Sequence, residues 1–175
     1  MLCISKGQLG TTPEQYSEKG CAEAMKACPG ITEAGRQASS AWMQDEGLAS
    51  AQDMLQRNPT INIFFGRADA LALGAAQAAK VGGISDAISV GCDGDRAGLE
   101  AVKAGTLKAT MTQQTQGMGR LALKSALELI KGEKPSRDLG DDSTPSRGSA
   151  VPSAGAKKDE PKGDASEGGM EPQPH

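Results

Sequence analysis

The segment from residue 61 to residue 113 most constrains the fold, because two short apolar runs in it each lead to an acidic residue that opens a helix-like run. Asp69 follows the first run, residues 61–65, and Asp93 follows the second, residues 87–91. Short continuous apolar runs are typical of strands buried in a parallel sheet. Both aspartates would then lie at the carboxyl ends of parallel strands, where open α/β sheets bind their ligands.

The same alternation extends over residues 1–134 and predicts an α/β fold, a doubly wound parallel sheet with helices on both faces. Strands are expected near residues 2–5, 31–39, 61–65, 87–91 and 106–112, and helices near residues 14–27, 45–57, 69–80, 95–104 and 116–131. Proline and glycine signals separate these elements.

Residues 135–175 have a different composition, with no Ile, Phe, Tyr or Trp and with six of the nine prolines of the chain. Such a segment buries too little apolar surface to offset its conformational entropy. We therefore expect one lobe over residues 1–134 and a disordered tail over residues 135–175.

The sequence lacks the features that several classes of partner would require. The formal net charge is −3, and the Lys and Arg residues are spread along the chain, so no nucleic-acid interface is predicted. No apolar run approaches the ~20 residues that span a bilayer. Residues 1–6 lack the basic start and apolar core of a secretory signal, so the chain as given carries no predicted signal peptide.

Catalytic and metal-binding motifs are also missing from the sequence. Cys3, Cys21, Cys28 and Cys92 form no C-x-x-C pair, and the single histidine is His175, so we expect small buried thiols rather than a metal site. The motifs G-x-S-x-G, G-x-x-x-x-G-K-[ST] and H-E-x-x-H do not occur. The sequence predicts neither an enzyme nor a bound cofactor.

The two aspartates are expected to have different roles. Asp93 lies between Gly91 and Gly94, so its carboxylate can stand in a cleft and accept hydrogen bonds from adjacent sugar hydroxyls. The alternative for Asp93 is a carboxylate that caps its own loop. Asp69 is instead expected to be a helix N-cap, and Asp95 the cap of the following helix.

Four further side chains complete the predicted ligand site. Arg67 could pair with a ligand hydroxyl, carboxylate or phosphate, or could neutralise Asp69 or Asp93. Trp42, the only tryptophan, could stack on a sugar ring or pack in the core. Gln15 and Gln113 each offer a donor and an acceptor, which suits hydroxyl groups.

The last predicted helix, residues 116–131, is apolar on two faces. One face carries Met118, Leu121, Ala122, Ser125 and Leu129, and the other carries Leu123, Leu127 and Ile130. A single sheet covers only one face of a helix. We expect this helix to self-associate or to pack against a partner domain that this sequence does not contain.

At these residues the chain resembles the ribose-binding type of periplasmic solute-binding proteins, whose type I fold is shared with the effector domains of the lactose-repressor family. The motifs that carry the resemblance are ASAQDML at 49–55 followed by Asn58-Pro59, IFFGRADALALGA at 63–75, VGCDG at 90–94, GTLKAT at 105–110 and LIKGEK at 129–134. The resemblance covers residues 1–134 and corresponds to the second lobe of such a protein plus its crossover helix.

The resemblance implies a two-lobed clamp that closes on a monosaccharide in the cleft between its lobes. Such a protein works in the periplasm and delivers the sugar to the membrane permease of an ABC transporter. Asp93 matches the sugar-binding aspartate of the family, Gln113 its hinge-side glutamine, and Trp42 an aromatic wall of the cleft.

Two positions depart from the pattern of the family. Gln15 stands where ribose binders commonly have an arginine, and Ala68 where they commonly have an asparagine, although neighbouring Arg67 could compensate. A single lobe supplies half of the contacts, so weak binding of a free sugar is expected. Two alternatives are an effector-sensing domain of a lactose-repressor-type transcription regulator and a non-functional remnant that dimerises through the last helix.

Overall fold

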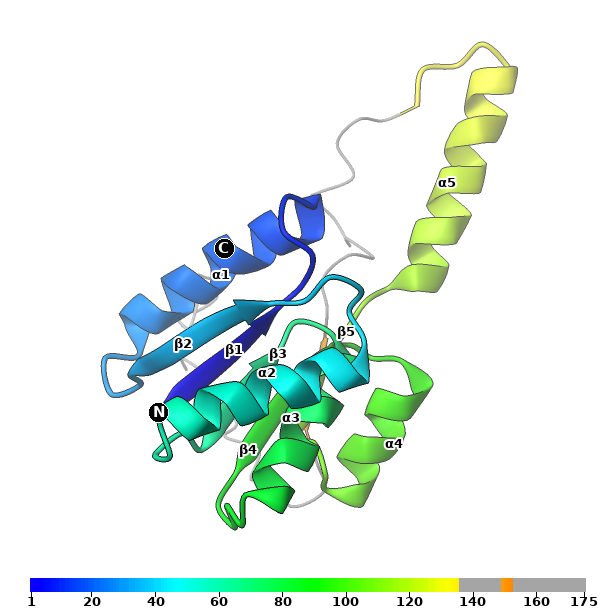
Figure 1. Cartoon of the computed structure of the whole chain (residues 1–175). Helices are drawn as coiled ribbons and strands as arrows, with labels where there is room; N and C mark the ends of the chain where they lie inside the picture. The colour runs from blue at the N-terminus through cyan, green and yellow to red at the C-terminus, as the bar shows by residue number, and fades with distance from the viewer. Residues whose placement is uncertain (136–148, 153–175) are drawn as a thin grey trace, which may run out of the picture.

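The computed structural model describes residues 1–135 and 149–152, and over the first range strands and helices alternate along the chain (Figure 1). The strands are β1 (Leu2–Lys6), β2 (Glu33–Ala38), β3 (Ile63–Gly66), β4 (Ile88–Asp93), β5 (Ala109–Thr112) and β6 (Ser149–Pro152). The helices are α1 (Thr12–Ala27), α2 (Gln44–Arg57), α3 (Asp69–Val81), α4 (Arg96–Ala104) and α5 (Thr115–Ile130). The predicted alternation and the α/β fold are confirmed.

The sheet has the strand order β2-β1-β3-β4-β5-β6, and its first five strands are parallel. The chain runs from β1 outward to β2, then crosses back past β1 to β3 and continues to β5. The order therefore reverses between β1 and β3, and in open α/β sheets ligands bind at the carboxyl ends of the strands near such a reversal.

The core lies between the sheet and the layer formed by α2, α3 and α4 (Figure 1). Phe64 is fully buried in β3 and packs against alanines of α2 and α3. The two helices come into backbone contact at two glycines, since a Cβ atom on Gly74 would lie 2.1 Å from the carbonyl oxygen of Gln44, and one on Gly47 2.3 Å from that of Leu71. Small residues thus bring α2 and α3 together.

The opposite face of the sheet is covered by α1 alone among the described helices, with an apolar groove of about 700 Å³ between them. Cys21, Met25 and Cys28 of the α1 region line this groove, together with Phe65 of β3. The expectation of buried thiols is wrong for Cys28, which is exposed because it follows the last turn of α1, and Cys21 is only half-buried.

Helix α5 projects away from the sheet and its covering helices (Figure 1). None of its residues is buried, and Leu123 and Ile130 are 65% and 81% exposed. As the sequence predicts, its apolar surface has no cover within the described residues. No helix in this part of the chain has the length and apolar character needed to cross a bilayer.

The structure differs from the expected disordered tail at residues 149–152, which form β6. This strand pairs antiparallel with β5, with Thr112 opposite Ser149. Without it β5 would be an open edge, whose free N–H and C=O groups can pair with any extended segment. Composition alone does not reveal such pairing. The rest of the predicted tail, residues 136–148 and 153–175, lies outside the described residues.

Candidate ligand-binding site

The five predicted ligand contacts each follow a different parallel strand. They are Gln15 near the start of α1 after β1, Trp42 between β2 and α2, Arg67 after β3, Asp93 at the end of β4, and Gln113 after β5. Because the strands are parallel, these positions share the carboxyl edge of the sheet. The fold thus places all five candidates at the edge where an α/β sheet binds ligands.

Asp93 and Gln113 are in direct contact. The side-chain amide of Gln113 donates to Oδ1 of Asp93 at 2.6 Å, and its backbone N–H donates to the Asp93 carbonyl at 2.8 Å. Both residues line a hollow of about 370 Å³ together with Gly94, Asp95 and Thr115. A carboxylate has about four acceptor positions, so one bond from Gln113 leaves Asp93 able to accept more.

Partial burial shapes the electrostatics of Asp93. Desolvation raises the pKa of its carboxyl group, and the nearby charge of Asp69 raises the pKa further. The hydrogen bond from Gln113 and one from the backbone of Asp69 act in the opposite direction. A half-buried carboxylate held by an amide suits uncharged hydroxyl donors better than another anion.

The expectation that Asp69 caps its helix is wrong. The N-cap of α3 is Ala68, and Asp69 is the first residue of that helix, with its side chain fully buried. Its Oδ2 accepts hydrogen bonds from the backbone N–H groups of Gly94 at 2.9 Å and Asp95 at 3.0 Å, and its Oδ1 accepts one from the Thr110 hydroxyl at 2.5 Å. Asp69 therefore ties α3 to the loop after β4 and to β5.

Glycines leave the space that the Asp69 carboxylate occupies. A Cβ atom on Gly91 would lie 2.2 Å from Oδ1 of Asp69, and one on Gly98 2.0 Å from Oδ2. Burial raises the pKa of Asp69, while the hydrogen bond from Thr110 lowers it. The predicted cap at Asp95 is confirmed, since its carboxylate accepts from the Gly98 N–H at 2.6 Å.

Trp42 is half-buried, and its indole lies directly on the backbone that follows β1. A Cβ atom on Gly7 would lie 1.6 Å from Cη2 of Trp42, so only glycine leaves room for the ring. The backbone of Trp42 has a φ of 61°, in the left-handed region that non-glycine residues rarely adopt. The ring position depends on this unusual backbone conformation.

The loop that carries Trp42 is held by Glu46, in the first turn of α2. Its carboxylate accepts hydrogen bonds from the backbone N–H groups of Ser40 at 2.8 Å, Ala41 at 2.9 Å and Met43 at 3.3 Å, and from the Ser40 hydroxyl. The Ser40 hydroxyl and these backbone donors lower the pKa of Glu46 to about 2. Glu46 is thus ionised throughout the neutral range.

Arg67 is buried, and its guanidinium pairs with Glu14 at 3.2 Å and Glu18 at 2.6 Å. Its neutralising partners are therefore these two glutamates of α1, and not Asp69 or Asp93, which were one of the alternatives that the sequence left open. The Nε atom of Arg67 is buried without a hydrogen-bond partner within the described residues.

Two more cations join this group, which we call the charge cluster: Lys6, Glu14, Glu18, Arg36 and Arg67. Lys6 pairs with Glu14 at 2.9 Å and with Glu18 at 3.0 Å, and Arg36 also contacts Glu18. Lys6 is the main cause of the lowered pKa of Glu14. Gln15 lies beside the cluster on an exposed position of α1.

The roles of Glu46 and of the two glutamates in the charge cluster were not predicted from the sequence. Glu14 and Glu18 are spaced i, i+4, which places them on one face of a helix, and this spacing was the available signal. Glu46 is the third residue of α2, where an acidic side chain typically returns to the backbone before the helix.

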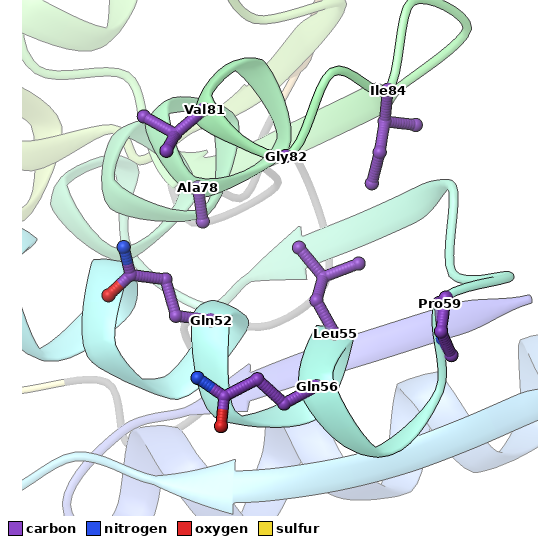
Figure 2. A pocket seen from close by; sticks show the side chains of 8 residues that line it. All are labelled: Gln52, Leu55, Gln56, Pro59, Ala78, Val81, Gly82 and Ile84. Atoms are coloured by element: carbon purple, nitrogen blue, oxygen red, sulfur yellow. The ribbon is translucent and has the colours of Figure 1, made fainter.

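Figure 2 shows a second hollow, which none of these residues line. It has a volume of about 410 Å³ and is lined by Gln52, Leu55, Gln56, Pro59, Ala78, Val81, Gly82 and Ile84, between the C-terminal parts of α2 and α3. Pro59 and Ile84 precede β3 and β4, so this hollow is at the opposite edge of the sheet. In residues 1–135 and 149–152, no group of three or more His, Cys, Asp and Glu side chains could hold a metal ion.

Comparison with known proteins gives the family of this fold. The sequence model described as "Periplasmic binding protein domain" matches residues 1–134. The chain belongs to the periplasmic binding protein family. This periplasmic binding protein is 31% identical to the D-allose-binding periplasmic protein of Escherichia coli K12 over 134 residues, which are 76% of this chain and 43% of that protein. It is 37% identical to the E. coli ribose import binding protein over 89 residues, 51% of this chain and 30% of that protein.

Solved structures agree with this assignment. An ABC transporter solute-binding protein from Actinobacillus succinogenes with bound D-allose superposes with a TM-score of 0.72 and 26% identity, over 76% of this chain and 47% of that one. One from Bacillus halodurans with bound myo-inositol gives a TM-score of 0.71 and 28% identity, over 76% and 46%. The periplasmic binding protein described here thus spans less than half the length of these relatives.

Proposed function

We propose that this chain is a sugar-binding lobe of a periplasmic solute-binding protein that serves an ABC-type sugar import system. The observation that carries the proposal is the Asp93–Gln113 pair, which lines a hollow at the carboxyl edge of the sheet. Relatives and structural neighbours that bind ribose, allose and myo-inositol support it.

The proposed chemistry is non-covalent. Asp93 accepts hydrogen bonds from neighbouring hydroxyls of the sugar, and Gln113 both orients Asp93 and offers its own oxygen as an acceptor. The indole of Trp42 packs on the C–H groups of the sugar ring while the hydroxyls stay hydrogen-bonded. Gln15 is proposed as a further contact, whereas Arg67 is proposed to act indirectly, by holding Glu14 and Glu18 in the wall of the site.

An uncharged monosaccharide is the proposed ligand class. The three cations of the charge cluster are paired with three carboxylates, those of Glu14, Glu18 and the adjoining Glu33, so the wall beside the site has balanced charge. Asp93 lies in a half-buried position where a second anion would be repelled. The charge cluster and the half-buried carboxylate of Asp93 therefore both favour an uncharged polyol over an anionic ligand.

The proposed setting follows from the same relatives. The sugar is held in a cleft whose other wall comes from a second lobe, and the loaded protein delivers it in the periplasm to a membrane permease. The matched part of this chain covers less than half of its relatives, so residues 1–134 by themselves make part of the contacts and bind the sugar weakly.

Isothermal titration calorimetry with a panel of pentoses and hexoses tests the proposal. Asp93→Ala should weaken binding at least tenfold, because hydrogen bonds to a charged group contribute about 1.5–3 kcal/mol. Asp53→Ala is the matched control, since Asp53 is an aspartate on α2 paired with Arg57 outside the site. Binding that Asp93→Ala leaves unchanged contradicts the proposed site.

Self-association is a second candidate property, favoured by the exposed apolar side chains of α5. The alternative role as an effector domain of a lactose-repressor-type regulator uses the same fold. A helix-turn-helix segment encoded upstream in the same gene would favour that role.

A further inference from the structure

Backbone strain coincides with the proposed ligand contacts. Among the described residues, the non-glycine residues with a positive φ are Trp42 at 61° and Asp93 at 127°. Such conformations cost conformational free energy and persist only where surrounding groups hold them, and they cluster at functional sites. Two separate loops of this lobe are therefore held against their intrinsic preference.

One buried carboxylate holds the Asp93 loop. Oδ2 of Asp69 accepts from the two backbone N–H groups that follow Asp93, those of Gly94 and Asp95. Since Asp69 is fully buried and begins α3, its position is set by the core and not by the ligand.

A second carboxylate holds the Trp42 loop in a similar way. Glu46 accepts from backbone N–H groups on both sides of Trp42, those of Ser40 and Ala41 before it and of Met43 after it. Like Asp69, Glu46 lies in the first turn of a helix. In both loops the carboxylate bonds to backbone groups, so the side chain of the proposed ligand contact is not used in these bonds.

We propose that Asp69 and Glu46 are positioning residues that hold the loops of Asp93 and Trp42 in the binding conformation before the sugar arrives. This inference rests on the proposed function of Asp93 and Trp42 as ligand contacts. Preorganisation of this kind removes an ordering cost from binding. When a variant leaves only about a tenth of the molecules in the competent conformation, the apparent Kd rises about tenfold.

The Asp69 clamp is tested with a substitution that breaks it and one that keeps it. Asp69→Ala leaves the N–H groups of Gly94 and Asp95 without their acceptor, so their amide hydrogens should lose exchange protection in the unliganded protein. Asp69→Asn can keep all three bonds, because its oxygen can face the two N–H groups while its NH₂ donates to the Thr110 oxygen. Sugar affinity should fall about tenfold or more in Asp69→Ala and return to within a few-fold of wild type in Asp69→Asn.

The Glu46 clamp has its own reporter, since Trp42 is the only tryptophan. Glu46→Ala should shift the fluorescence emission of the unliganded protein to longer wavelength, as the indole leaves Gly7 for water. Glu46→Gln keeps one of the two acceptor oxygens and should give a smaller shift. Asp53→Ala, which removes a carboxylate from the same helix, should leave the spectrum unchanged.

Thr110→Val separates positioning from a purely structural role. It removes the third bond to Asp69 but leaves the bonds to the Asp93 loop, so it should lower the melting temperature while sugar affinity stays within a few-fold of wild type. Equal loss of affinity in Thr110→Val and Asp69→Ala at matched stability would overturn the proposal.

The outcomes in the unliganded protein do not depend on the identity of the sugar. Retained amide protection in Asp69→Ala, or an unshifted spectrum in Glu46→Ala, overturns the proposal. Lost amide protection in Asp69→Ala and a shifted spectrum in Glu46→Ala support the positioning proposal, whatever sugar is bound. If the wild-type protein binds none of the sugars tested, that result counts against the proposed function alone.

Discussion

Five charged side chains gather near the end of β1, and Arg67 is the most deeply buried of them, with its side chain 1% exposed. A buried cation persists only when paired, because removing a charge from water costs several kcal/mol. Glu14 and Glu18 of α1 supply the pairing, and the Arg67 guanidinium also donates to the Glu14 carbonyl at 3.2 Å. The cluster therefore fixes the N-terminal half of α1 to the carboxyl edge of the sheet.

Replacement of Arg67 by methionine should lower the melting temperature by several degrees, because it leaves the glutamates with fewer partners in a buried position. Arg57→Met is the matched control, since the Arg57 side chain is 74% exposed and pairs with Asp53 at the surface. Exposed pairs contribute little, so that variant should melt within about a degree of wild type. Thermal melts followed by circular dichroism measure both, and equal melting temperatures for the two variants contradict the structural role of Arg67.

The stability of the protein should depend on pH through the ionisation of Glu46. Its pKa falls from 4.5 to about 2 on folding, so the ionised form favours the folded state. This contribution is present above pH 4.5 and is lost as pH falls toward 2. Urea denaturation should therefore show Glu46→Gln to be less stable than wild type at pH 7, with the difference shrinking between pH 4.5 and pH 2. A difference that does not change with pH would contradict this.

The contribution of Asp69 to stability depends on pH in the opposite direction, because burial raises the pKa of Asp69. Its contribution to stability is present below the ordinary aspartate value and is lost as pH rises through the raised pKa. In the same denaturation series, Asp69→Asn should gain stability relative to wild type as pH rises.

At the scale of elements, the apolar runs and the proline and glycine signals were sufficient to predict the five parallel strands and five helices to within a few residues. They could not predict β6, because its pairing depends on the edge that β5 offers. They also placed Asp93 and Gln113 at strand ends, where the two meet. These sequence patterns did not predict the role of Asp69, because its three hydrogen-bond donors lie 25, 26 and 41 residues further along the chain.

The contact between α2 and α3 gives a prediction at this scale. Gly74→Ala places a methyl group where the carbonyl oxygen of Gln44 lies 2.1 Å away, so the helices must separate. Overpacking of this kind costs about 1–3 kcal/mol, which chemical denaturation can measure. Gly20→Ala on α1 is the control, because nothing lies within 4 Å of the added methyl group. There the higher helix propensity of alanine should stabilise the chain slightly.

At the scale of the whole molecule, the chain combines a packed lobe with a helix that the lobe does not cover. In α5, Leu123, Leu127 and Leu129 are each more than half exposed. Apolar surface of this kind favours contact with another protein surface. The matched part of this chain covers less than half of the solved relatives.

Sedimentation tests whether α5 drives self-association when no second lobe is present. We expect a dimer at micromolar concentration, and a monomer for the double variant Leu123→Ser and Leu127→Ser. Lys124→Ser is the control, because it changes the same helix without removing apolar surface. A monomeric wild-type chain would count against self-association.

The pairing of Thr112 with Ser149 determines where the chain leaves and rejoins the sheet on either side of α5. The chain leaves the sheet after Thr112, and Ser149 lies opposite Thr112 in β6, so both ends of the stretch between β5 and β6 lie at neighbouring positions of the sheet. Gln113 is the first residue after β5 on the path to α5, and its side-chain amide donates a hydrogen bond to Asp93. The residue that contacts Asp93 therefore also lies in the short connection between the sheet and the projecting helix.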